Sequence, residues 1–154
     1  MGREQQGGAM SSDDLKKSLI GCWRLLSMHL KTSDGKVSYP FGSDALGYYI
    51  FSESGYMSVN IMPVNRPKSG SGDVLCWSVE EKVKAAETYI SYSGKYEIQG
   101  DKLIVHPEVV FFQNWVGVDQ VRTLELSGNQ MTLSSPPMLA SGIEQTAHLV
   151  WERI

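Results

Sequence analysis

Arg122 carries more chemical information than any other residue of this sequence, because it lies among alternating apolar residues. Pairing across the two-residue turn at Gly128-Asn129 places Leu124 and Leu126 on the inner face of a hairpin, and the period of two puts Arg122 on the same face. A guanidinium on an apolar face needs a partner, since an unpaired buried charge is costly. Its forked N–H donors suit a carboxylate or tryptophan of the protein itself, or an oxygen atom of a ligand.

Three further side chains could transfer protons beside Arg122. Turn pairing predicts that Tyr92 and Tyr96 point inward, whereas the face of His106 stays open because the adjacent Pro107 favours a bulge. In an enzyme, Arg122 would polarise a carbonyl while His106 or one of the tyrosines moved the proton. This constellation defines one hypothesis: a cofactor-independent cyclase, isomerase or dehydratase acting on a polyketide- or terpenoid-like substrate.

Most other function classes lack support in the sequence. The three histidines are isolated and no Gly-rich loop joins a strand to a helix, so neither a metal nor a cofactor is expected. The net charge of -3 argues against nucleic acid as a partner. No apolar run reaches the roughly 20 residues of a membrane span. Cys22 and Cys76 fit no metal spacing and are expected to be free thiols, which without a secretory leader predicts a cytoplasmic location.

A length of 154 residues predicts one domain. Residues 1–14 are polar and rich in Gly and Gln, and we interpret them as a disordered tail or a remnant of cloning, with the domain at 15–154. Within the domain, short apolar segments of period two alternate with turn signals. The predicted strands are 20–32, 47–52, 56–62, 89–99, 102–113, 116–127, 130–135 and 145–153. Sequential strands joined by tight turns favour an all-β fold, an up-and-down antiparallel barrel of eight or nine strands, over a sandwich.

One short α-helix is predicted at about 78–87. Ser78 and Glu81 have the spacing of a capping box, in which each side chain accepts a backbone N–H of the first turn. Val79 and Val83 lie on one stripe of this helix. We expect that stripe to pack on the sheet, so that the helix acts as a lid.

The inner wall predicted by strand alternation is rich in Tyr, Met, Leu and Trp and poor in polar groups, which is typical of a small-molecule pocket. On the first strand, alternation places Ser27 and His29 on the same face as Trp23. The residues expected to line the pocket are Ser27, His29, Tyr48, Met57, Val59, Tyr92, Tyr96, Val105, His106, Trp115, Arg122, Leu124, Leu133, Met138 and Trp151.

The favoured hypothesis is a binding protein for a small, largely apolar or aromatic molecule anchored by Arg122. The enzyme described above is the alternative, and an interior filled entirely by side chains is a third interpretation. The expected partners are the small ligand and, at most, a second copy of the chain in a homodimer.

An ordered set of residues resembles the lipocalin-like domain family of small bacterial and fungal proteins. The set comprises Gly21, Trp23, Leu25, Ser27, Asp34-Gly35, Pro40-Phe41-Gly42, Gly47, Gly55-Tyr56-Met57-Ser58, Tyr92, Gly94, Tyr96, His106, Trp115, Gly117, Arg122 and Leu149-Val150-Trp151-Glu152-Arg153. The resemblance implies a barrel with a central pocket and a tryptophan near one end, covered by an arginine from a late strand. Here Trp23 with Arg153 or Arg122 would form that structural cation–π pair. The resemblance also implies that some members occur beside natural-product pathways.

Overall fold

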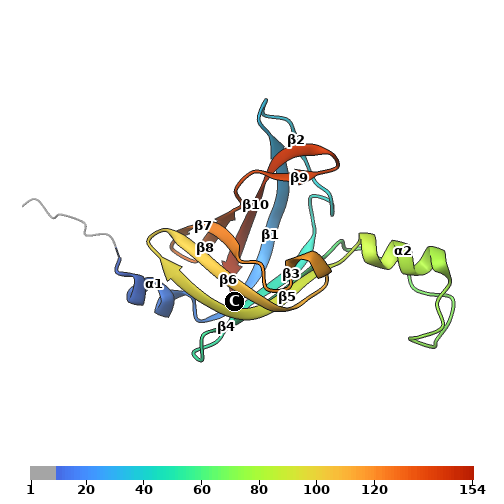
Figure 1. The fold of residues 1–154 in the computed structure, drawn as a ribbon, viewed down its shortest axis with the longest axis horizontal. Coiled ribbons are helices and arrows are strands. Elements are labelled where there is room, and N and C mark those ends of the chain that lie inside the picture. Colours follow the sequence, from blue (N-terminus) through green and yellow to red (C-terminus); the bar gives the residue numbers. More distant parts are fainter. Residues whose placement is uncertain (1–9) are drawn as a thin grey trace, which may run out of the picture.

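The computed structural model describes residues 10–154, in which tight turns join most strands to their sequence neighbours (Figure 1). The elements are α1 (Ser12–Leu19), β1 (Gly21–Thr32), β2 (Val37–Ser38), β3 (Leu46–Phe51), β4 (Tyr56–Met62), α2 (Val79–Glu87), β5 (Ile90–Gln99), β6 (Lys102–Val110), the 3-10 turn η1 (Gln113–Trp115), β7 (Gln120–Ser127), β8 (Gln130–Ser134), β9 (Met138–Ala140) and β10 (Ile143–Arg153). All eight predicted strands are present. The short strands β2 and β9 and the helix α1 were not anticipated.

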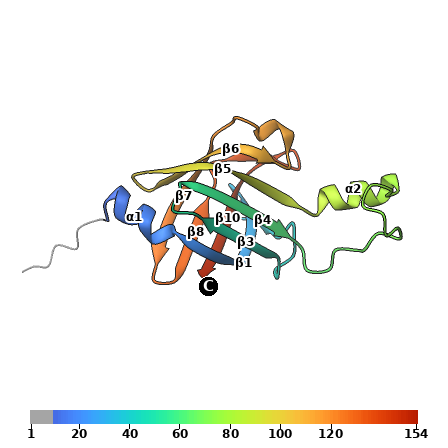
Figure 2. The same ribbon diagram turned by 90° about the horizontal axis from the view of Figure 1, so that it is seen from below.

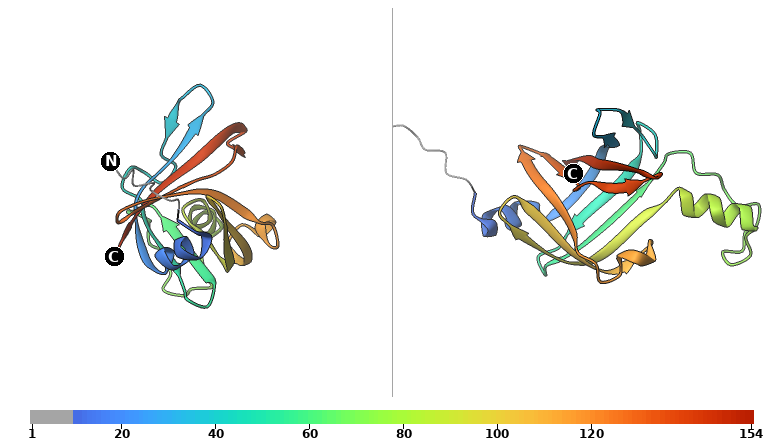
Figure 3. Two further views of the ribbon diagram at one scale, coloured as in Figure 1. Left: turned by 90° about the vertical axis from the view of Figure 1, so that its left-hand side faces the viewer. Right: turned by 45° about the horizontal axis from the view of Figure 1, so that its top comes forward.

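The sheet closes on itself because β1 pairs with both β3 and β10. Within residues 10–154 the strand order is β2-β1-β3-β4-β5-β6-β7-β8-β10-β9, and the additional β1–β10 pairing completes an antiparallel barrel of eight strands. Strands β2 and β9 extend β1 and β10 beyond the barrel (Figure 3). The expected barrel is therefore confirmed, and the sandwich is excluded.

Two β-bulges interrupt the regular alternation of side chains. The β1–β10 register shifts between Leu25 and Ser27, and the β5–β6 register shifts at Gly94, which faces Pro107. A bulge inserts one extra residue and so changes the phase of the side chains beyond it. The second bulge lies where Pro107 predicted one. The first had no such signal in the sequence.

The inner faces of the strands form a continuous apolar core. Its largest fully buried side chains are Trp23, Trp151, Tyr49, Phe51, Leu19, Leu103, Met131, Val59 and Val105. Of the inward positions derived from the two hairpin turns, Leu103, Val105, Leu124, Met131 and Leu133 are buried, and Ile98 and Leu126 are partly buried against the core. Turn pairing thus assigned these faces correctly, since cross-strand partners point the same way.

Helix α1 covers one end of the barrel (Figure 2). It begins after Ser11, whose side chain caps the backbone N–H of Asp14, and it buries Leu19 completely. Trp23 then donates its indole N–H to the Leu19 carbonyl over 2.9 Å. The helix starts before the expected domain boundary at residue 15, because Ser11 supplies an N-cap that we did not identify. Residues 1–9 of the expected tail lie outside the described residues.

Helix α2 has the predicted capping box but not the predicted packing. Ser78 accepts from the Glu81 amide over 3.1 Å, and the Glu81 carboxylate accepts from the Ser78 amide over 2.9 Å. Val79 and Val83 are nevertheless 70% and 50% exposed, and the helix projects away from the barrel (Figure 1). The predicted lid on the sheet is therefore wrong. The polar contacts of α2 tie it to the preceding loop instead of to the barrel.

The sequence predicted free thiols at both cysteines and no membrane-spanning segment. Both Cys22 and Cys76 are free thiols. Among residues 10–154, neither helix has the length and apolar character needed to cross a membrane.

Candidate functional site

The lumen of the barrel contains a mostly apolar cavity of about 80 Å³. Late residues of β1 and β4, early residues of β5 and middle to late residues of β10 contribute to its wall. The β1, β4 and β5 residues place it toward the end of the barrel opposite α1. The lining residues are Met28, Leu30, Tyr49, Val59, Ile61, Ile90, Tyr92, Trp115, Arg122, Leu133, Met138, Ala147, Leu149 and Trp151. An apolar wall with a few polar groups is the usual composition of a small-molecule site.

Two polar atoms of the lining are buried without a hydrogen-bond partner. They are the hydroxyl of Tyr49 and the indole N–H of Trp151, and no other buried side-chain N or O atom of residues 10–154 is unpartnered. Their side chains are 1% and 0% exposed. A buried donor left unsatisfied costs about 1–3 kcal/mol. Such groups need an explanation, because nearly all buried polar atoms of native proteins are paired.

The environment of Tyr49 keeps its phenol protonated. Burial raises the pKa of Tyr49 well above its usual value, the neighbouring Tyr92 and Tyr96 phenols raise it further, and Arg122 lowers it. The Tyr92 side chain is near enough to contribute to this shift, but it does not form a hydrogen bond of normal geometry with the Tyr49 hydroxyl. The net upward shift means that the Tyr49 hydroxyl is neutral at physiological pH and can donate a hydrogen bond. Tyr92 and Arg122 act on this hydroxyl from the same lumen wall.

Arg122 lines the lumen as expected, but neither of its expected protein partners is there. Its guanidinium donates to the Val121 carbonyl over 2.8 Å and to Oε1 of Gln120 over 3.4 Å. Within the described part of the chain it forms no ion pair with a carboxylate and lies over no aromatic ring. The cation–π partner of Trp23 is Arg153, at 4.2 Å from the ring centroid. Some of the five guanidinium N–H donors therefore stay available to a ligand.

The structure brings about half of the expected pocket residues together. Those in the lumen wall are Val59, Tyr92, Trp115, Arg122, Leu133, Met138 and Trp151. Met57, Tyr96, Val105 and Leu124 point inward but are buried in the packed core outside the cavity lining. Of the groups proposed for catalysis, only Arg122 and Tyr92 share the lumen.

Ser27 and His29 lie on the outer face of β1, so their assignment to the pocket is wrong. The bulge after Leu25 shifts the phase, so that Met28 and Leu30 point inward in their place. Tyr48 is also misassigned: it is 50% exposed, and its neighbour Tyr49 is the buried residue. The sequence did contain a signal for Tyr49. Its cross-strand partner is Val59, whose inward direction was predicted, and paired residues share a face.

His106 lies outside the lumen, which resolves the face left open by the sequence. It pairs across β5 with the exposed Lys95, and its Nδ1 atom lies 2.6 Å from the Asp119 carboxylate. Glu97 is 3.9 Å from the other ring nitrogen. These contacts form a solvent-facing cluster, so His106 does not join Arg122 and Tyr92.

His29 has a structural setting on the outer face, where its ring stacks on that of His148 with centroids 5.0 Å apart. Burial, followed by His29 and Lys31, lowers the pKa of His148 from its ordinary value of 6.5. A histidine with a lowered folded-state pKa takes up its proton preferentially in the unfolded chain. Stability is therefore complete above the ordinary pKa and decreases as the pH falls through the lowered one.

We expect the thermal midpoint of unfolding to fall between pH 7 and pH 5, with a smaller fall in His148→Gln. The amide of glutamine does not titrate, so the variant loses the proton uptake that favours unfolding. Thermal unfolding followed by circular dichroism at several pH values measures both slopes. Equal slopes in the two proteins would contradict this role of His148.

An apolar vestibule adjoins the lumen. It has a volume of about 300 Å³ and lies between the start of β5 and the segment around η1. Ile90 and Trp115 line both spaces. The other residues of the vestibule are Phe41, Ala86, Glu87, Tyr89, Phe111 and Phe112. This aromatic hollow lies next to the end of α2.

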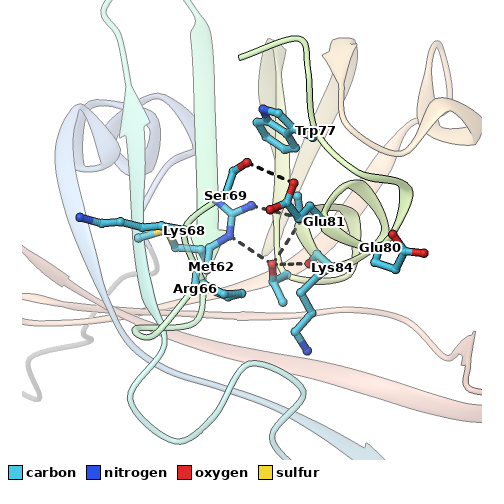
Figure 4. A pocket seen from close by; sticks show the side chains of 11 residues that line it. Met62, Arg66, Lys68, Ser69, Trp77, Glu80, Glu81 and Lys84 are labelled. Atoms are coloured by element: carbon cyan, nitrogen blue, oxygen red, sulfur yellow. Dashed lines mark hydrogen bonds between the residues drawn. The ribbon is translucent and has the colours of Figure 1, made fainter. Parts of the chain in front are cut away.

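A hollow of about 510 Å³ lies outside the barrel between α2 and the loop before it (Figure 4). Two of its charged side chains, Arg66 and Glu81, are already paired within the protein. Arg66 donates to Oγ1 of Thr88 and to the Ala85 carbonyl, and Glu81 accepts from the amide of Gly70 and the hydroxyl of Ser69 (Figure 4). These backbone and hydroxyl donors lower the pKa of Glu81. We interpret this hollow as the contact region in which these hydrogen bonds hold the loop against α2.

The closed antiparallel barrel with a cavity in its lumen and a helix across one end places the chain among the small up-and-down barrels. The family described as lipocalin-like domain matches residues 20–154, so the chain belongs to the lipocalin-like domain family.

Two individual proteins resemble the chain. The 4'-hydroxy-3'-methoxypropiophenone carrier protein ppsC of Aspergillus oryzae is 28% identical over 107 residues, which cover 64% of this chain and 96% of the relative. The crystal structure of a lipocalin-like protein from Bacteroides uniformis aligns over 88% of this chain and 98% of that one, with a TM-score of 0.45 and 14% identity.

Proposed function

We propose that this protein binds a small, largely apolar aromatic molecule in the lumen of the barrel, with Arg122 as an anchor, and acts as a carrier for it. The observation that carries the proposal is the lumen itself, an apolar cavity whose wall includes a guanidinium without a carboxylate partner among the described residues. Apolar contacts would supply affinity, and the polar groups would fix the orientation.

The comparison with known proteins supports the same proposal. The relative from Aspergillus oryzae is named as a carrier of a phenolic aryl ketone. A single aromatic ring with oxygen substituents suits an apolar wall that also holds Tyr49, Arg122 and Trp151. Family membership supports binding in a barrel interior. It does not specify the ligand.

The size of the lumen determines how a ligand would be accommodated. A cavity of about 80 Å³ is smaller than typical ligand pockets of about 300–1,000 Å³. Met28 and Met138 in its wall have flexible, unbranched side chains that adapt readily to a guest. The vestibule of about 300 Å³ beyond Trp115 and Ile90 supplies further apolar room. We therefore expect a ligand ring to displace methionine side chains and to extend toward the vestibule.

Arg122→Ala tests the anchor with 4'-hydroxy-3'-methoxypropiophenone as the probe. Loss of a charge-assisted hydrogen bond to a ligand oxygen should weaken binding by about tenfold, which equals about 1.4 kcal/mol. Isothermal titration calorimetry or tryptophan fluorescence quenching gives the dissociation constants. The matched control is Arg24→Ala, because Arg24 is an exposed arginine that pairs with Glu152 on the outer surface.

Three results of this experiment differ in meaning. Tenfold weaker binding in Arg122→Ala with unchanged binding in Arg24→Ala supports the anchor. Equal binding in all three proteins would remove the anchor while leaving the lumen as a binding site. Absence of saturable binding of this probe and of simpler alkyl- and acylbenzenes in the unmodified protein would overturn the proposed function.

A further inference from the structure

The floor of the lumen holds two hydrogen-bond donors that the protein itself leaves unused, the hydroxyl of Tyr49 and the indole N–H of Trp151. We propose that these donors form a subsite for a neutral carbonyl oxygen, so that the ligand class is an aryl ketone or a related aryl carbonyl compound. This inference rests on the proposed binding function and adds the chemical group that the site selects.

Strand register places the two donors deep in the barrel. Tyr49 on β3 pairs with Trp23 on β1, and Trp151 on β10 pairs with Leu25 on the same strand. Trp23 is fully buried directly beneath α1, to whose Leu19 carbonyl it donates. Tyr49 and Trp151 are therefore the lining residues next to the closed end.

The two donors belong to neighbouring side chains. The Tyr49 and Trp151 rings form an edge-to-face pair with centroids 5.4 Å apart. A carbonyl oxygen has two lone pairs and can accept two hydrogen bonds. We infer that one ligand oxygen placed between the two side chains would accept from both donors, whereas an alkyl group there would leave both unsatisfied.

The chemistry of the donors selects an acceptor. An indole N–H only donates, and the raised pKa keeps the Tyr49 phenol in its donating form. A ligand group that only donates would therefore leave the Trp151 N–H unpaired. A neutral acceptor is sufficient at this subsite, because both of its donors are neutral, and Arg122 in the same wall stays available to a second oxygen of the ligand. A ketone, aldehyde or ester carbonyl meets these requirements.

The test uses two probes of nearly equal shape, propiophenone and propylbenzene, which differ by the carbonyl group. Dissociation constants of both are measured for the unmodified protein and for Tyr49→Phe. The ratio of the two constants, compared between proteins, cancels the different cost of removing each probe from water. We expect the preference for propiophenone to fall about tenfold in Tyr49→Phe, which equals about 1.4 kcal/mol.

Trp151→Phe tests the second donor by the same ratio, which also cancels packing losses common to both probes. We expect a fall of about fivefold. The matched control is Tyr96→Phe, which removes the hydroxyl of another buried tyrosine, one that donates to the Ser52 carbonyl over 3.4 Å and does not line the cavity. Its preference for propiophenone should equal that of the unmodified protein.

A spectroscopic measurement distinguishes a hydrogen-bonding role from a structural one. The infrared C=O stretch of bound propiophenone should lie below its position in hexane and return toward that position in Tyr49→Phe. The thermal midpoint of Tyr49→Phe, expected at or above that of the unmodified protein, checks that the variant is folded, because the substitution removes an unpartnered buried hydroxyl.

The outcomes separate this inference from the proposed function. A preference that falls in Tyr49→Phe and stays constant in Tyr96→Phe supports the subsite. Saturable binding of both probes with the same ratio in all variants, and an unshifted C=O stretch, would overturn the subsite and leave the binding function intact. Failure of the unmodified protein to bind either probe or any related aromatic compound would overturn both.

Discussion

Gly94→Ala should unfold the barrel or destabilise it by more than about 3 kcal/mol. A methyl group on Gly94 would lie 2.0 Å from the backbone carbonyl oxygen of His106, and 3.1 Å from the Glu108 amide nitrogen. These are backbone atoms at the β5–β6 bulge, so no side-chain rotation can relieve the clash. The two strands would have to separate at the point where the bulge brings them closest.

Urea unfolding followed by circular dichroism gives the loss of stability for Gly94→Ala. The control is Gly72→Ala, because the added methyl group there meets no atom within 4 Å. Its stability should change by less than about 0.5 kcal/mol, as for most surface substitutions. Near-native stability of Gly94→Ala would show that the bulge is more adaptable than its geometry indicates.

Arg153→Ala should have the second largest effect, a loss of about 2–4 kcal/mol from one cation–π contact and two charge-assisted hydrogen bonds. Arg153 lies 4.2 Å from the Trp23 ring centroid and donates to the carbonyls of Ile20 and Ser18 at the end of α1. It joins the last strand to the helix that covers the barrel. The substitution leaves these carbonyls without their donor and the tryptophan face without its cover.

Arg153→Lys should recover little of that loss, since a single ammonium group cannot reproduce the planar fork. Arg24→Ala is the matched control: its ion pair with Glu152 spans 3.2 Å on an exposed surface, and such pairs contribute at most about 1 kcal/mol. Chemical unfolding of the three variants gives the comparison. If Arg153→Ala lost no more stability than Arg24→Ala, Arg153 would not stabilise the barrel by joining β10 to α1.

The barrel was predictable because most of its information is local. Two-residue turns set the register of their hairpins, which fixed the inward faces of Leu103, Val105, Leu124 and Met131 without knowledge of the other strands. Counting every second residue back from the Gly128-Asn129 turn predicted that Arg122 points into the barrel, and Arg122 lines the lumen. Hairpin register is determined by the turn, so errors do not accumulate over short strands.

The predictions that failed concern features that depend on contacts between residues far apart in the sequence. The bulge after Leu25 depends on pairing with β10, more than a hundred residues away, and it reversed the faces of Ser27 and His29. The apolar stripe of α2 predicted packing on the sheet. Instead, Arg66 of the preceding loop donates to the Ala85 carbonyl of α2, and Glu81 of α2 accepts from the Gly70 amide of that loop, so the helix is held against the loop. Periodicity identifies an apolar face but not the surface that it meets.

Helix α1, Trp23 and Arg153 close one end of the lumen. If the proposed ligand enters from the other end, where Ile90 and Trp115 lie, it would also leave by that end, and the part that entered first would leave last. Exchange would then not proceed by passage through the barrel from one end to the other. Residence time, more than the rate of arrival, would then be set by the innermost contacts.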